Sequence, residues 1–232
     1  MKRIGILGGT FNPIHIGHLR LALEMREIFA LDQLDLLPSA RPPHRSHDTL
    51  LPFELRLQLV QAAVRDESKL RVNPVEGQRP GPSYTWTSLQ EYACNAAAHH
   101  FFILGCGDFC RIAQWHRGRE LPYLVDFIVV SRKKESRQAF CATVHELWPE
   151  ARPQSNKTGC ASSTAFCLPD GKCMYYLPTT RLDISASCIR SRFLQGRSLR
   201  YLVPQAVLDC LESERQSVLR CWSQLPDKPQ PA

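Results

Sequence analysis

The chain has 232 residues, of which 44% are hydrophobic and 22% charged, with a formal net charge of +7. This length suits one α/β domain, or a main domain with a small appendage. No run is long enough to cross a bilayer, and the first residues enter an apolar run rather than a signal peptide, so we expect a cytoplasmic protein without membrane contact. The basic residues are scattered, so the charge fits polyphosphate substrates as well as nucleic acid.

The ten cysteines are expected to remain thiols, because disulfides are rare in cytoplasmic proteins. They lack the C-x-x-C pairs of ordinary zinc sites, so we predict no metal site in the protein itself. Loop cysteines at 160, 167 and 173 could still converge. A zinc-stabilised interaction protein therefore stays open as an alternative.

The first predicted element is a strand at residues 4–7, which ends in Gly8 and Gly9. A turn follows, and the apolar positions between 19 and 29 predict a helix. His15 and His18 lie at the start of this helix, where unpaired N–H groups and the helix dipole attract anions. The pattern predicts a phosphate-binding centre, although H-x-x-H alone is also typical of zinc ligands and of packed core histidines.

A second strand is predicted at 36–38, and it must stop at Pro38. The loop 39–47 carries Ser39, His44 and Arg45 at the carboxyl end of that strand, which is where open α/β sheets bind ligands. A solvated surface loop would have the same composition. Pro52 is expected to open a helix with apolar positions at residues 53, 57, 60 and 64.

A third strand is predicted at 70–75, and Ser83 is the expected N-cap of the next helix. The first turn of that helix, with Thr85, could hold a carboxylate or could simply be capped. A buried strand at 101–104 leads to small residues and Asp108, whose carboxylate could bind a ribose hydroxyl. Trp115 follows, either as a stacking platform or as a core residue.

After a fifth strand at 126–130, residues 131–172 show no motif and are predicted to be irregular or an insertion. A strand at 174–177 precedes a helix start, where the hydroxyls of Ser185 and Ser187 can accept hydrogen bonds from backbone N–H groups. The guanidinium of Arg190 can donate two hydrogen bonds to the oxygens of a phosphate. A short helix from Pro204 ends in a frayed tail at 226–232. The alternation of strands and helices predicts an α/β doubly wound parallel sheet in a domain at 1–204, with a C-terminal helix and tail at 205–232.

Five motifs together resemble those of a known family. G-G-T-F-N-P-I-H-I-G-H, starting at Gly8, and I-S-A-S-x-I-R at 184–190 are similar to motifs of the nucleotidyltransferase superfamily. P-P-H-R at 42–45, P-S-Y-T at 82–85 and G-x-x-D-F…W at 105–115 complete the order found in bacterial nicotinate-nucleotide adenylyltransferases. The likeness covers patches of 4–130 and then 181–194.

The resemblance implies a Rossmann-like fold. It also implies the transfer of AMP from ATP to nicotinate mononucleotide, which gives deamido-NAD and pyrophosphate. This reaction is a step of NAD biosynthesis and uses Mg²⁺ together with ATP. It implies that His18 lies at the α-phosphate and His15 nearby on the triphosphate. Arg190, Ser185 and Ser187 would hold the β and γ phosphates. The nucleotide cleft would be lined by Gly8, Gly9, Thr10 and Phe11.

For the acceptor, the resemblance implies His44 and Arg45 at the phosphate, the Thr85 amide at the pyridine carboxylate and Trp115 on the ring. The chain departs from the family in two places: Gly107 stands where an Asp is usual, with Asp108 one residue late, and Ser39 replaces a frequent Asn. A sister enzyme acting on nicotinamide mononucleotide or phosphopantetheine is one alternative. A basic nucleic-acid-binding module is another, although we expect no nucleic-acid partner, and a homo-oligomer is left open.

Overall fold

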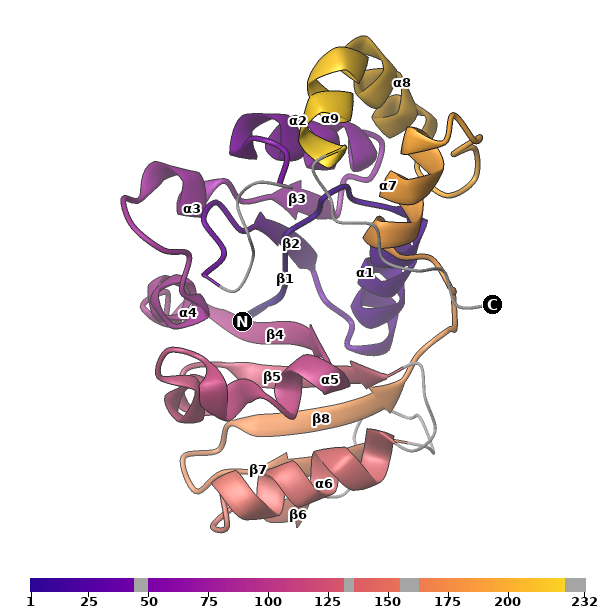
Figure 1. Cartoon of the computed structure of the whole chain (residues 1–232). Helices are drawn as coiled ribbons and strands as arrows, with labels where there is room; N and C mark the ends of the chain where they lie inside the picture. The colour runs from indigo at the N-terminus through magenta and orange to yellow at the C-terminus, as the bar shows by residue number, and fades with distance from the viewer. Residues whose placement is uncertain (44–49, 132–135, 155–162, 224–232) are drawn as a thin grey trace.

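The strands of this chain form one sheet in the order β3-β2-β1-β4-β5-β8-β7-β6 (Figure 1). The coordinates are a computed structural model that describes residues 1–43, 50–131, 136–154 and 163–223. All pairs from β3 to β8 in this order are parallel, whereas β7 and β6 are antiparallel to their neighbours. The predicted doubly wound parallel sheet is therefore confirmed, with an antiparallel extension at one edge. The strands are β1 (Lys2–Gly9), β2 (Gln33–Pro38), β3 (Leu70–Val72), β4 (Ala98–Gly105), β5 (Asp126–Ser131), β6 (Arg152–Gln154), β7 (Thr164–Cys167) and β8 (Cys173–Pro178).

Helices cover both faces of the sheet. Successive residues of a strand point to opposite faces, and on β4 Phe101 and Ile103 join one hydrophobic cluster while Phe102 and Leu104 join the other. The first face is covered by α1 (Ile16–Ile28), α2 (Phe53–Ala63), α7 (Ala186–Leu194), α8 (Gln205–Ser213) and α9 (Arg215–Trp222). The second is covered by α4 (Thr85–Ala93), α5 (Cys106–Phe109), α6 (Ser136–Leu147) and the short 3₁₀ turns η2 (Ile112–Gln114) and η3 (Gly118–Tyr123).

The third predicted strand is too long. β3 ends at Val72, and residues 75–78 form the short helix α3 (Val75–Gln78). The reason is local, because the Asn73 side chain accepts a hydrogen bond from the Val75 N–H at 3.1 Å and turns the chain. The polar residues at 73 and 74 therefore end the strand early.

The interpretation of residues 131–172 as irregular is wrong for the described part of that region. It contains α6, β6 and β7, and the two strands extend the sheet beyond β8. Phe140, Val144 and Trp148 are fully buried against the second face. Their spacing of four residues is a helical signal in the sequence.

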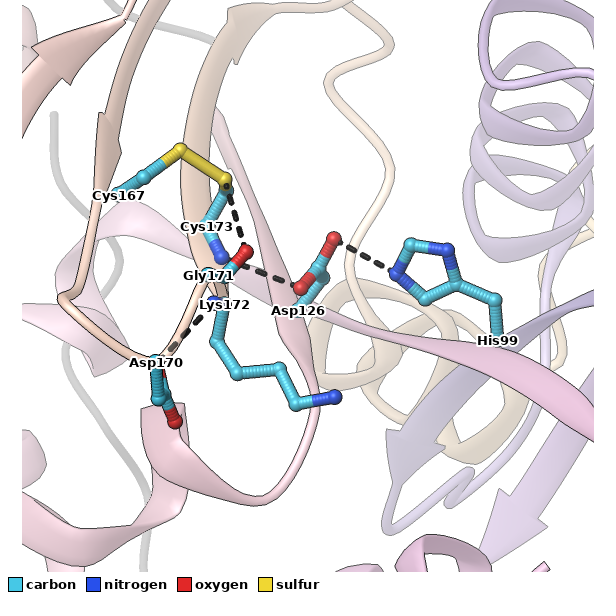
Figure 2. The surroundings of a disulfide bond; sticks show 7 residues. All are labelled: His99, Asp126, Cys167, Asp170, Gly171, Lys172 and Cys173. Carbon is cyan, nitrogen blue, oxygen red and sulfur yellow. Dashed lines mark hydrogen bonds and ion pairs between the residues drawn. A yellow bond between two sulfur atoms is a disulfide. The ribbon is translucent and has the colours of Figure 1, made fainter. Parts of the chain in front are cut away.

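Cys167 and Cys173 form a disulfide, so the expectation of thiols throughout is wrong for this pair (Figure 2). The two residues lie opposite each other in the β7–β8 hairpin, with Cα atoms 4.0 Å apart. Asp126 anchors the same end of β8, because its carboxylate accepts the Cys173 N–H at 3.1 Å and contacts His99 Nε2 at 2.9 Å. The cysteines at 94, 110, 141, 188, 210 and 221 are free thiols, and Cys160 lies outside the described residues.

The frayed tail predicted at 226–232 also lies outside the described residues. Within the described ranges, no helix combines the length and the apolar character needed to cross a membrane.

Candidate active site

The turn between β1 and α1 is shaped by close packing. A Cβ atom on Gly9, at the end of β1, would lie 2.9 Å from the Phe11 ring, so a larger residue would displace that ring. Phe11 itself has a φ of 47°. The turn leads to His15, which is the N-cap residue of α1. Residues 8–11, predicted to line a nucleotide cleft, thus lie in the segment that leads to a helix N-terminus.

His15 and His18 form a stacked pair at the start of α1. Their ring centroids are 3.7 Å apart with 23° between the planes. The His15 backbone N–H donates to His18 Nδ1 at 3.3 Å, so in the neutral ring the proton sits on Nε2 and makes that atom a donor. His15 is only 3% exposed whereas His18 is half-buried, so His18 is the imidazole nearer the surface.

The start of α7 has the hydroxyl-rich geometry that the sequence predicts. Ser185 is the N-cap, and its Oγ accepts the Cys188 N–H at 3.2 Å. The Oγ atoms of Ser185 and Ser187 are 3.0 Å apart. Arg190 lies one turn further along the same helix.

The starts of α1 and α7 meet at Asn12. Arg190 Nη1 donates to the Asn12 backbone oxygen at 2.8 Å. The Asn12 side-chain oxygen accepts the Leu51 N–H at 3.2 Å and Trp222 Nε1 at 3.4 Å. Figure 1 shows α7 beside α1, on the face that also carries α9. Two helix N-termini with an arginine and a histidine donor form a suitable site for a polyanion.

The loop after β2 joins this turn on its other side. Ser39 donates its N–H to the Gly9 oxygen at 2.9 Å. Ser83 Oγ accepts the N–H groups of residues 40 and 41 at 3.0 and 2.9 Å. The prediction that Ser83 caps the next helix is therefore wrong, because Tyr84 is the N-cap of α4 and the Ser83 hydroxyl binds the β2 loop instead.

Thr85 and Trp115 lie in segments that pack against each other. Thr85 is the first residue of α4, and Trp115 directly follows η2. Their sequence neighbours Tyr84 and His116 stack with ring centroids 4.3 Å apart and 25° between planes. Trp115 is half-buried against the cluster of the second face. The two segments predicted to bind a flat carboxylated ring are thus side by side.

Other predicted site residues are not brought into this group. Asp108 is exposed on α5 and accepts a hydrogen bond from Arg111 Nη2 at 2.8 Å, so it forms a surface ion pair. Beside it, a Cβ on Gly107 would meet no atom within 4 Å, so a side chain fits there. His44 and Arg45 lie outside the described residues.

Sequence reasoning missed contacts that shape the site. Arg117 lies over the Trp86 ring, 3.7 Å from its centroid, and so ties η3 to α4. Arg56 is only 1% exposed and binds backbone carbonyls around the site. The available signal for Arg56 was its spacing, three and four residues before the buried Leu59 and Val60. Periodicity over apolar residues alone does not detect a buried charge.

The site offers hydrogen-bond donors rather than a metal cage. Across the part of the chain that the structure describes, no group of three or more His, Cys, Asp or Glu side chains lies close enough to hold a metal ion. The imidazole, guanidinium and hydroxyl groups gathered around Asn12 are typical of anion binding.

The sequence of this chain is similar to those of known proteins over most of its length. The model of the cytidylyltransferase-like family matches residues 6–192. A protein of Geobacter metallireducens is 37% identical over 215 residues, covering 92% of this chain and 97% of the relative, and one of Pseudomonas aeruginosa is 39% identical over 215 residues, covering 91% and 95%. Both are named "probable nicotinate-nucleotide adenylyltransferase".

Solved structures show the same fold at low sequence identity. The nicotinic acid mononucleotide adenylyltransferase of Plasmodium falciparum, in complex with NaAD, superposes with a TM-score of 0.66 at 16% identity, covering 94% of this chain and 98% of that one. The two chains therefore share the same fold over nearly their whole lengths.

Proposed function

This chain belongs to the cytidylyltransferase-like family, and we propose that within it the chain is a nicotinate-nucleotide adenylyltransferase, which moves AMP from ATP to nicotinate mononucleotide in NAD biosynthesis. The observation that carries the proposal is the contact between Arg190 and the Asn12 backbone, which brings two helix starts together in one candidate site. ATP is abundant in the cytoplasm, and we propose that the enzyme works there.

The proposed reaction needs positioning and charge stabilisation rather than a protein nucleophile. A phosphate oxygen of nicotinate mononucleotide attacks the α-phosphorus of ATP, and the bond from that phosphorus to the α,β-bridging oxygen breaks. Pyrophosphate leaves with the bond's electrons, and the adenylyl group ends in the new dinucleotide. The enzyme must stabilise charge on the α-phosphate and on the departing pyrophosphate.

We assign the ATP side to the groups around Asn12. His18 Nε2–H is the donor to an α-phosphate oxygen, because the hydrogen bond at Nδ1 fixes the proton on Nε2. Arg190 and the hydroxyls of Ser185 and Ser187 hold the β and γ phosphates at the start of α7. His15, buried behind His18, orients that ring by stacking.

We assign the acceptor side to α4 and the turn after η2. The N-terminus of α4 at Thr85 presents backbone N–H groups and a partial positive charge to the pyridine carboxylate. Trp115 lies close by, where its accessible part can contact the flat ring. A neutral nicotinamide lacks the carboxylate, so this arrangement favours the acid form.

Magnesium enters this proposal with ATP. The groups around Asn12 are donors that suit an anion, so we propose that Mg²⁺ is held by phosphate oxygens and water rather than by a dedicated protein cage. It supplies additional neutralisation of the triphosphate charge.

A direct assay tests the acceptor. The protein is incubated with ATP, Mg²⁺ and one of nicotinate mononucleotide, nicotinamide mononucleotide or phosphopantetheine, and pyrophosphate release is measured. We expect nicotinate mononucleotide to give the highest kcat/KM, by at least about tenfold, because a site built for the carboxylate leaves its donors unpaired with the other acceptors. Faster turnover with another acceptor would contradict the substrate assignment, and tight salt-dependent binding to an oligonucleotide without turnover would contradict the enzyme itself.

A further inference from the structure

Arg56 of α2 is a charged side chain in a fully buried position. It is 1% exposed, and among the described residues its guanidinium is bound by backbone oxygens and forms no ion pair with a carboxylate. Burial lowers its pKa to about 10, while the charges of Glu54 and Glu76 act in the opposite direction. The group is therefore charged at neutral pH, and its position needs an explanation because a buried charge is costly unless its donors are satisfied.

Its donors are satisfied by three segments that are separate in the sequence. Nη1 donates to the Thr10 oxygen at 2.8 Å and to the Ser39 oxygen at 2.6 Å. Nη2 donates to the Ala40 oxygen at 3.1 Å, and Nε donates to the Leu51 oxygen at 2.9 Å. Thr10 belongs to the turn after β1, whereas Ser39 and Ala40 belong to the loop after β2. One rigid guanidinium thus joins the turn that leads to the His15–His18 pair to the loop after β2.

In the loop after β2, two successive peptide groups are hydrogen-bonded at both their oxygen and their N–H. The peptides that follow Ser39 and Ala40 give their oxygens to Arg56, and their N–H groups donate to Ser83 Oγ at 3.0 and 2.9 Å. A peptide plane bound at both its oxygen and its N–H cannot rotate without losing a hydrogen bond. Ser83 lies two residues before Thr85, so the constraint continues to the start of α4.

We propose that Arg56 is a positioning residue for adenylyl transfer, which sets the separation between the turn at Thr10 and the loop at Ser39 and Ala40 without touching either substrate. This proposal rests on the proposed function. Two polyanions must meet with their reacting atoms closely aligned, and a misplacement of about 1 Å can cost about 10²-fold in rate. Arg56 fixes the frame in which the two binding sites are aligned.

Arg56→Lys is the most informative change. Lysine keeps the charge, but it presents its three donors from a single atom and cannot reach carbonyls of all three segments as the planar fork does. We expect kcat to fall by about 10²-fold. The affinities of the variant for an ATP analogue that does not react and for nicotinate mononucleotide are measured separately by calorimetry. They should change less than about threefold, because Arg56 touches neither. Arg65→Lys, an exposed arginine just beyond the end of α2, is the matched control and should leave all values unchanged.

A second variant covers the case in which Arg56→Lys fails to fold. Ser83→Ala removes the other side of the same clamp at a less buried position, and we expect a smaller fall in kcat, about fivefold or more, with substrate affinities unchanged. In the double variant the two effects should be less than additive, since both act on the same peptides. A Ser83→Ala enzyme with wild-type kcat would overturn the proposal.

Wild-type kcat in Arg56→Lys, together with a lowered melting temperature, would likewise reduce Arg56 to a structural residue and overturn the proposal. Failure of the proposed function is a separate result, because the wild-type protein would then release no pyrophosphate with any of the acceptors.

Discussion

Arg190 donates a hydrogen bond of 2.8 Å to the backbone oxygen of Asn12, 178 residues earlier in the chain. The contact joins the turn after β1 to the start of α7, and Trp222 Nε1 approaches the Asn12 side chain from α9 at 3.4 Å. Both segments predicted to grip a triphosphate therefore meet at one residue. Helix α9 therefore packs against this contact, since Trp222 is fully buried.

Replacement of Arg190 by lysine should weaken both ATP binding and turnover. Lysine cannot donate to Asn12 and to phosphate oxygens with the same planar fork. Because charge-assisted hydrogen bonds contribute about 1.5–3 kcal/mol each, we expect the KM for ATP to rise by about 10-fold or more. Arg192→Lys is the control, since Arg192 binds the Ser198 oxygen on the exposed side of α7. Equal effects from the two variants would contradict a phosphate role for Arg190.

His18→Ala should lower kcat by about 10²-fold or more while the affinity for ATP changes less. A donor to the α-phosphate acts mainly on charge that develops in the transition state, so its loss appears in turnover. Steady-state kinetics with calorimetric binding of an ATP analogue separates the two effects. His145→Ala, an exposed histidine on α6, should change neither. A loss confined to binding would count against the proposed role of His18.

Trp115→Ala should raise the KM for nicotinate mononucleotide more than it raises the KM for ATP. Trp115 is half-buried beside the Tyr84–His116 stack, so loss of the indole removes a contact surface for the ring. Trp115→Phe should recover part of the loss. A fall in melting temperature without a change in the acceptor KM would instead identify Trp115 as a core residue.

Local chemistry explains which parts of this fold were predictable. The Ser185 cap is correct because a serine at a helix start bonds within its own turn, and this needs no distant partner. Ser83 has the same local pattern, yet its hydroxyl binds residues 40 and 41, more than forty positions away in the chain. Nothing in the sequence around Ser83 distinguishes the two outcomes.

Buried polar groups and pairings between distant strands were beyond sequence reasoning. Asp35 was predicted to precede β2, but it lies inside the strand, where its carboxylate accepts hydrogen bonds from Tyr92 and Gln33. The burial of Arg56 within an apolar helix was equally unpredictable from the sequence. The Cys167–Cys173 pairing depends on the β7–β8 hairpin, and β7 falls in a region without a recognised motif. In each case the partner is fixed only by the tertiary structure.

His100 should make the free energy of unfolding depend on pH. It is 5% exposed and packs against the Tyr92 ring, and burial lowers the pKa of its imidazole below the ordinary value. The folded state therefore keeps His100 neutral while the unfolded chain takes up a proton near pH 6.5. The free energy of unfolding should consequently fall as the pH decreases through about 6.5.

Urea unfolding at pH 7.5 and at pH 5.5 measures this dependence. His100→Gln, which removes the titrating group, should show a smaller loss of stability between the two pH values than the wild type does. The exposed His145→Gln variant should keep the wild-type difference. An unchanged difference in His100→Gln would show that other groups control the acid sensitivity.

The Cys167–Cys173 disulfide should contribute to stability without affecting catalysis. It closes a short loop, with a sequence separation of 6, so the chain-entropy contribution is about 2 kcal/mol. It lies where β8 begins, beside Asp126 at the beginning of β5, whereas the candidate site is built on segments that follow the carboxyl ends of β1, β2, β3, β4 and β8. We therefore expect Cys167→Ser with Cys173→Ser to lower the free energy of unfolding by about that amount and to leave kcat and both KM values unchanged. Alkylation of both cysteines in unreduced, unfolded protein would show that the pair is not bonded, and a changed kcat would show that the two ends of the strands are coupled.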